Sequence, residues 1–102
     1  MSADSTSFLS DRLAAKLARD GHRREVVDRL DAADFSGGRA GRPEWARHNE
    51  RVHVAILLCS TERGFDAAFQ LARTDWRDVL VAGGLADDGW TEWLDGWFAE
   101  SR

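Results

Sequence analysis

The chain has 102 residues, of which 43% are hydrophobic and 31% charged, and its formal net charge at pH 7 is −4. That length suits one domain with one core, and the acidic balance argues against nucleic acid as the main partner, because neutralising phosphates dominates such affinity. A single cysteine excludes an internal disulfide and fits a reducing compartment. We find neither a signal peptide nor an apolar run long enough to cross a membrane, so we expect a cytoplasmic protein.

The charges are spread unevenly along the chain. Residues 1–51 carry ten basic and nine acidic side chains, whereas residues 52–102 carry four and nine. Nearly all the basic residues are arginines, and alanine and glycine are plentiful. This bias indicates a GC-rich bacterial genome and says nothing about mechanism.

Two amphipathic helices are predicted in the first third of the chain. Residues 1–7 are small and polar and predict a disordered N-terminus. Ser7 suits the N-cap of a first helix from Phe8 to about Arg19, and Gly21 suits the left-handed position after its end. A second helix is expected from about His22 to Ala33. The inward-facing residues are Leu9, Leu13 and Leu17 of the first helix, and Val26, Val27 and Leu30 of the second.

A glycine-rich loop separates these helices from a third, which begins at Pro43. Three glycines between residues 37 and 41 cost too much backbone entropy for a helix, so we expect a loop over Phe35–Arg42. Proline fits the first turn of a helix, where its missing N–H costs nothing. The apolar run Val52–Cys59 could also be a buried strand, but a helical phase that starts at Trp45 favours one central helix.

Residues 64–82 carry one apolar stripe at helical spacing. Its unbroken phase favours a single helix that Gly83 and Gly84 end. In the alternative, Thr74 and Asp75 cap a new helix, which places negative charge at the positive end of its dipole. The stripe consists of Phe65, Ala68, Phe69, Ala72, Trp76, Val79 and Leu80.

The last predicted helix is rich in tryptophan and is capped by Asp87 or Asp88. Its apolar stripe is too large to leave in water, so we expect the helix to fold back onto the third and fourth helices, with its tryptophans buried. In the alternative, the stripe is the seam of a homodimer or the dock for a partner helix. The stripe consists of Trp90, Trp93, Leu94, Trp97 and Phe98, of which the three tryptophans are candidate interface residues.

These elements predict an all-α fold, a single-domain bundle of about five helices that spans residues 8–100. One part of the chain contains Arg51-Val52, Ala55, Leu57 and Ala72, followed by the run DWRDVL at residues 75–80. This pattern resembles one found in small uncharacterised bacterial helical proteins. The resemblance implies a helical fold and brings no activity, site or substrate with it.

The histidines and the cysteine do not form a recognisable catalytic or metal site. His48 and His53 lie five residues apart, whereas a zincin helix needs two histidines at i and i+4 on one face. Glu44 and His48 have that spacing, but two ligands do not make a zinc site. We expect His53 to be partly exposed and Cys59 to be a small buried hydrophobe. We therefore predict no enzyme activity, no metal and no cofactor.

The glycine loop is basic but lacks the Gly-Lys-Ser/Thr ending and the preceding strand of a phosphate-binding P-loop. An acidic protein partner or a phosphorylated group could still dock on its arginines. The candidate partner-binding residues are Arg39, Arg42, Arg47 and Arg51.

We predict a non-enzymatic cytoplasmic protein that acts through contact with an unidentified protein partner or with itself. This prediction depends mainly on the missing parts of an enzyme. The alternative is a small nucleic-acid-associated regulator that uses the arginines of the first two helices, Arg19, Arg23, Arg24 and Arg29.

Overall fold

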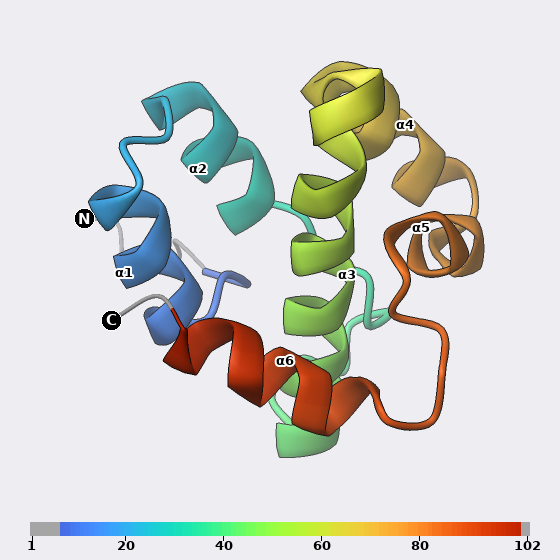
Figure 1. Cartoon of the computed structure of the whole chain (residues 1–102). Coiled ribbons are helices and arrows are strands. Elements are labelled where there is room, and N and C mark those ends of the chain that lie inside the picture. The colour runs from blue at the N-terminus through green and yellow to red at the C-terminus, as the bar shows by residue number, and fades with distance from the viewer. Residues whose placement is uncertain (1–6, 101–102) are drawn as a thin grey trace. The chain divides into compact units, whose positions relative to one another are not determined.

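The structure is a computed structural model that describes residues 7–100, and within that range it contains six α-helices and no strand (Figure 1). The all-α class is confirmed, with six helices where about five were expected. The residues group into two compact units that meet between Glu50 and Arg51, inside the third helix, and each unit is described by itself. The extent of one domain over residues 8–100 stays a prediction. The helices are α1 (Asp11–Arg19), α2 (Arg24–Asp31), α3 (Pro43–Arg63), α4 (Phe65–Thr74), α5 (Trp76–Gly83) and α6 (Trp90–Ala99).

In the first unit, α1 begins later than its sequence suggests, because Ser10 and not Ser7 is its N-cap. The Ser10 hydroxyl oxygen accepts a hydrogen bond from the Leu13 N–H at 3.2 Å. Ser7 is used elsewhere, since its hydroxyl donates to the Asp31 carboxylate at the end of α2, and the Phe8 N–H donates to the Asp31 carbonyl at 2.9 Å. Of the expected disordered segment 1–7, residues 1–6 lie outside the described part of the chain.

The two helices of this unit are joined by the expected glycine turn. Gly21 adopts the left-handed conformation with φ 75°, and the following His22 N–H donates to the Leu17 carbonyl, which satisfies a free carbonyl at the end of α1. Helix α2 is shorter at both ends than expected. Val27 is only half-buried, whereas the other inward positions are buried as predicted: Leu9, Leu13, Leu17, Val26 and Leu30.

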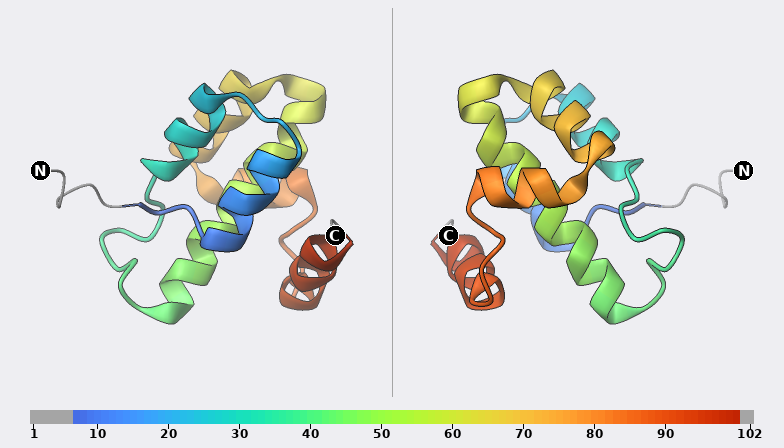
Figure 2. Two further views of the ribbon diagram at one scale, coloured as in Figure 1. Left: turned by 90° about the vertical axis from the view of Figure 1, so that its left-hand side faces the viewer. Right: turned by 90° about the vertical axis from the view of Figure 1, so that its right-hand side faces the viewer.

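Helix α3 starts at Pro43 as predicted and runs without a break to Arg63, as both views in Figure 2 show. The strand alternative for Val52–Cys59 is therefore excluded. Every residue from Val52 to Leu57 is buried, so α3 is covered all round along this stretch. His53 is 0% exposed, and the expectation of partial exposure is wrong because a helix covered on all sides has no wet face there.

In the second unit, residues 64–82 form two helices, and the prediction of a single helix is wrong. Asp75 interrupts the path with φ −158° and ψ 106°, and its carboxylate accepts a hydrogen bond from the Arg77 N–H at 3.0 Å. A single extended residue thus lies between α4 and α5. Gly64 alone joins α3 to α4, and its φ of 86° is one that other residues rarely adopt.

Helix α6 also begins differently from the expectation. Its N-cap residue is Gly89, and neither Asp87 nor Asp88 caps it with a side chain. Asp87 contributes its backbone carbonyl instead, which accepts a hydrogen bond from the Trp90 N–H at 3.1 Å. The residues from Asp87 to Gly89 therefore form a turn that leads into the helix, and both carboxylates stay exposed.

Two glycines of the second unit predict opposite responses to alanine. A Cβ at Gly83 would lie 3.2 Å from three atoms of Ala55 in α3, two of them backbone, whereas one at Gly96 would meet nothing within 4 Å. We expect Gly83→Ala to destabilise the protein by about 1 kcal/mol through overpacking. Gly96→Ala should stabilise it by about 0.5–1 kcal/mol through helix propensity. Urea unfolding of both variants checks this, and equal stabilisation by both would mean that α5 does not lie this close to α3.

Candidate functional site

The carboxylate of Asp34 holds the glycine loop of the first unit in place through hydrogen bonds. Its Oδ1 accepts hydrogen bonds from the Ser36 N–H at 2.9 Å, from the Ser36 hydroxyl, and from the Asn49 side-chain amide at 3.0 Å. Its Oδ2 accepts one from the Gly38 N–H at 3.1 Å. Burial raises the pKa of Asp34, but the hydrogen bonds from Ser36, Asn49 and Gly38 outweigh it and lower the pKa to about 2. The carboxylate therefore stays charged at neutral pH.

Two residues of α3, His48 and Asn49, complete this hydrogen-bond network. Asn49 is fully buried, and its side-chain oxygen accepts the Phe35 N–H at 2.6 Å. The Nε2–H of His48 donates to the Phe35 carbonyl at 3.1 Å, so both backbone groups of that residue are bound. The buried Ser36 hydroxyl also accepts the Arg39 N–H at 3.0 Å. The loop is thus a folded structure, although three of its residues are glycines.

Above this network, the loop forms a hollow of about 340 Å³ lined by Gly38, Arg39, Gly41 and Arg42. The Arg42 N–H donates to the Arg39 carbonyl at 3.0 Å, which closes a turn and brings the two arginines to the same hollow. The Arg39 guanidinium lies over the Trp45 ring, 4.7 Å from its centroid. The His48 ring in turn meets Trp45 edge-on, with centroids 5.4 Å apart.

The other two arginines of the expected partner-binding set lie in different surroundings. Arg47 lines a second hollow of about 270 Å³ beside Glu50, together with residues 10–12 and Ala46. Arg51 belongs to the second unit, where its Nε–H donates to the Leu85 carbonyl at 2.8 Å and its guanidinium lies 4.5 Å from the centroid of the Trp90 ring. Burial lowers the pKa of Arg51 against the opposing charge of Asp88. Only Arg39 and Arg42 therefore share one hollow.

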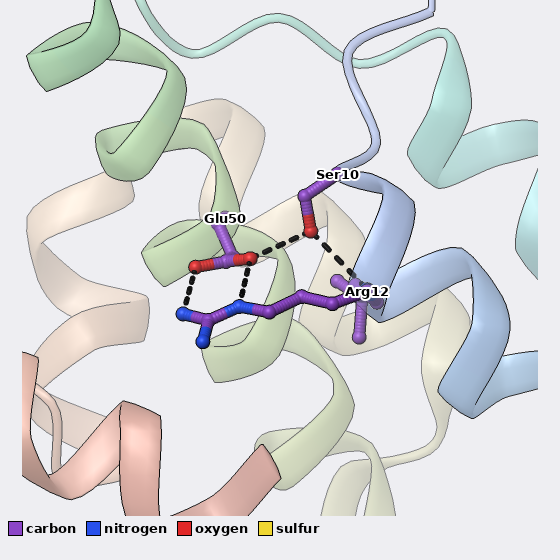
Figure 3. A network of polar contacts seen from close by, with 4 residues as sticks. Ser10, Arg12 and Glu50 are labelled. Carbon is purple, nitrogen blue, oxygen red and sulfur yellow. Dashed lines mark hydrogen bonds and ion pairs between the residues drawn. The ribbon is translucent and has the colours of Figure 1, made fainter.

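A charged cluster that the sequence does not reveal lies between α1 and α3 (Figure 3). Arg12 holds Glu50 with two hydrogen bonds, Nη2 to Oε1 at 2.7 Å and Nε to Oε2 at 2.8 Å. The Ser10 hydroxyl donates to Oε2 at 2.6 Å while its oxygen caps α1. Burial raises the pKa of Glu50, but the bonds from Arg12 and Ser10 and the charges of Arg12 and Arg47 outweigh it, and the pKa is lowered.

The tryptophan stripe of α6 is only partly buried. Leu94 and Phe98 are buried, Trp90 and Trp97 are half-buried, and Trp93 is 45% exposed, so the expectation that all three tryptophans are buried is wrong for Trp93. The Trp93 ring stacks on the Trp97 ring, with centroids 6.3 Å apart and planes 13° apart. The buried side of α6 is narrow because it consists of Leu94 and Phe98, whose side chains are smaller than that of tryptophan.

Cys59 is buried as predicted, and its thiol faces the Val79 carbonyl at 3.7 Å. Burial raises the pKa of the thiol, which disfavours the reactive thiolate. Within residues 7–100, no three histidine, cysteine, aspartate or glutamate side chains gather in a way that could hold a metal ion. No helix in the same range is both long and apolar enough to cross a membrane.

Comparison with family models, with curated proteins and with solved structures gives no match for this chain. The resemblance carried by the DWRDVL run at residues 75–80 therefore stays a prediction. In the structure, this run begins with the Asp75 cap and continues as the first part of α5. The aspartate and the N–H of Arg77 thus explain part of the pattern through helix capping.

The Arg12–Glu50 pair predicts unequal costs for its two halves. The Glu50 side chain is 5% exposed and the Arg12 side chain 38%, so an unpaired Arg12 can reach water while an unpaired Glu50 cannot. We expect Arg12→Met to destabilise the protein by about 2–3 kcal/mol, below the roughly 3–5 of a fully buried pair, and Glu50→Met to cost less. The double variant should cost less than the sum of the two. Urea unfolding of the complete cycle measures this, and additive costs would contradict it.

The Asp34 network predicts an acid-sensitive contribution to stability. The pKa of Asp34 is lowered from 3.8 to about 2 on folding, so its contribution is complete above pH 3.8 and disappears as the pH falls to about 2. At neutral pH we expect Asp34→Asn to destabilise the protein by about 1–3 kcal/mol, because buried donors lose an acceptor.

The difference in unfolding free energy between the wild type and Asp34→Asn should shrink as the pH falls from 3.8 to about 2. Chemical unfolding of both proteins at each pH measures it, and comparing the two cancels the titration of Glu50. Ser36→Ala removes one hydrogen bond to Asp34, so the pKa of Asp34 should fall less on folding. The pH range over which the stability changes should then be narrower. A difference that stays constant across the window would show that Asp34 does not titrate with a lowered pKa.

Proposed function

We propose that this chain is a small non-enzymatic protein that acts through protein–protein contact, and that α6 carries the contact surface. The observation that supports it is Trp93, which is 45% exposed although tryptophan is the residue that gains most from burial. Its ring is held in place by stacking on Trp97, so little side-chain entropy is left to lose on binding. An ordered, exposed tryptophan is the usual anchor of a protein interface.

The neighbours of Trp93 favour a positively charged partner. Between Gly84 and Glu100 the chain carries five acidic side chains, all exposed, and no basic one. Gly89 and Gly96 lie one turn before and one turn after Trp93, and Glu100 lies two turns after it on the same side. An arginine or lysine can therefore approach the face of the Trp93 ring that Trp97 leaves open and also meet a carboxylate. The proposed partner presents a basic segment with apolar residues.

The nucleic-acid alternative draws less support from the first unit. Arg24 lies 3.5 Å from Asp28, one turn along α2. Glu25 and Asp28 interrupt the line of arginines on that helix, so its exposed face is mixed in sign.

We place the protein in the bacterial cytoplasm, in keeping with its single cysteine and its arginine-rich composition.

A synthetic peptide rich in arginine and leucine tests the proposal. We expect it to bind the full-length protein, and Trp93→Ala to weaken binding by about 2 kcal/mol, or roughly 30-fold, as loss of a tryptophan anchor does. Fluorescence anisotropy of the labelled peptide measures the affinity. Binding should weaken with added salt, because the surrounding charges are exposed.

Val81→Ala is the matched control, since Val81 is 69% exposed and apolar but lies on α5. It should leave the affinity unchanged. Equal losses in both variants would indicate nonspecific adhesion, and unchanged binding by Trp93→Ala would remove α6 as the contact surface. A dimer that light scattering detects in the wild type and not in Trp93→Ala would replace the basic partner by a second copy of the chain.

A further inference from the structure

Two arginines at one hollow have no acidic partner within the described part of the chain. Arg39 and Arg42 are both exposed, and among residues 7–100 no carboxylate forms an ion pair with either of them. Asp34, the acidic residue that binds the loop, is occupied by the Ser36, Gly38 and Asn49 donors. The hollow therefore carries positive charge that the described part of the chain does not neutralise.

The position of Arg39 is set before any ligand arrives. Its backbone N–H is bound to the buried Ser36 hydroxyl, and its guanidinium lies 4.7 Å from the centroid of the Trp45 ring. Stacking occupies one flat face of the guanidinium and leaves its N–H edges available for hydrogen bonds. The turn bond from the Arg42 N–H to the Arg39 carbonyl holds the backbone of the second arginine at the same hollow. Binding an anion here therefore needs little ordering of the loop backbone or of Arg39, and mainly the Arg42 side chain is left to order.

The lining of the hollow suits a group with two negative charges. Gly38 and Gly41 line it, and a Cβ built at either would meet nothing within 4 Å, so a ligand can approach the backbone closely. Two guanidinium forks match a phosphate monoester, which carries a charge of about −1.5 to −2 and three acceptor oxygens. A carboxylate has one charge and two oxygens and occupies only one fork well.

We propose that the hollow formed by Gly38, Arg39, Gly41 and Arg42 is a binding site for a phosphate monoester on a side chain of a protein partner. This site belongs to the first unit, shares no residue with the α6 surface and does not depend on the proposal made for that surface. Its ligand is negatively charged, whereas the partner proposed for α6 is basic at the point of contact. A negative result for the α6 surface would therefore leave the loop proposal standing, and a negative result for the loop would leave the α6 proposal standing.

Calorimetric titration with a short peptide that contains one phosphoserine tests the site, with ¹H–¹⁵N spectra to follow the amides of Gly38 and Gly41. We expect the phosphopeptide to bind and shift those two amides, and the serine and glutamate versions of the peptide to bind at least about tenfold more weakly. Arg39→Gln and Arg42→Gln should each weaken phosphopeptide binding by about tenfold. Arg42→Lys keeps the charge but loses the fork, and it should also weaken binding.

The matched control is the pair Arg23→Gln and Arg73→Gln, which removes two exposed arginines far along the sequence from the loop. It should leave the affinity within about twofold, as loss of distant exposed charge does. Thermal melts check folding. If Arg39→Gln unfolds because it removes the guanidinium that stacks on Trp45, Arg42→Gln decides the test, since within residues 7–100 the Arg42 side chain makes no hydrogen bond, ion pair or ring contact that supports the fold.

Three results would overturn the proposal. One is equal affinity of the phosphopeptide for the wild type and Arg42→Gln. Another is a set of Gly38 and Gly41 shifts that inorganic phosphate produces as strongly as the phosphopeptide, which would assign the hollow to free phosphate. The last is tighter binding of an oligonucleotide than of the phosphopeptide, which would make the loop a nucleic-acid contact.

Discussion

The first unit depends on two consecutive polar residues of α3, Asn49 and Glu50, which are buried at 0% and 4% exposure. Successive residues of a helix point about 100° apart, so this pair faces two different neighbours. Asn49 binds the loop at Phe35 and Asp34, and Glu50 binds the start of α1 through Arg12 and Ser10. One turn of α3 therefore sets both the position of the loop and the position of the first helix.

Such groups gain little stability from burial and act mainly by excluding other arrangements. A buried carboxylate loses its hydration, and the pair with Arg12 roughly offsets that cost. An altered register of α1 would leave Glu50 unpaired, which costs far more than the pair contributes. The same reasoning holds for Asn49, since any other path of the loop would leave its amide without partners. The ordered arginine hollow is thus a consequence of polar groups that lie beneath it.

Apolar spacing was sufficient to predict the all-α class, because burial of one stripe of residues requires a helical period. The preference of proline for a first helical turn was sufficient to predict the start of α3 at Pro43. Apolar spacing was insufficient where polar side chains determine the residue at which a helix begins or ends. The break at Asp75 needs only one extended residue, so the apolar stripe continues in phase across it and hides it. Ser7 and Ser10 both have the chemistry of a cap, and the distant partners Asp31 and Glu50 decide between them.

The candidate site was predicted in part for the same reason. Glycines and arginines marked the loop, but whether Arg39 and Arg42 meet depends on a turn bond and a stack on Trp45 that no spacing rule contains. Arg51 has the same charge, yet Leu85 and Trp90 hold it within the second unit. The Asp34 and Glu50 clusters left no signal in the sequence beyond isolated polar residues, since their partners are 15 and 38 residues away along the chain.

The two proposed surfaces draw on different physics. Contact through Trp93 gains free energy mainly from removing an aromatic ring from water, and the charges around the ring are secondary. Contact through Arg39 and Arg42 gains from charge and hydrogen bonds at an open hollow, where screening by salt is strong. A partner that used both would need a basic apolar segment and a phosphorylated side chain in the same molecule. Phosphorylation could then regulate one contact while the other persists, which is a reason for a small chain to keep its basic loop and its acidic helix chemically distinct.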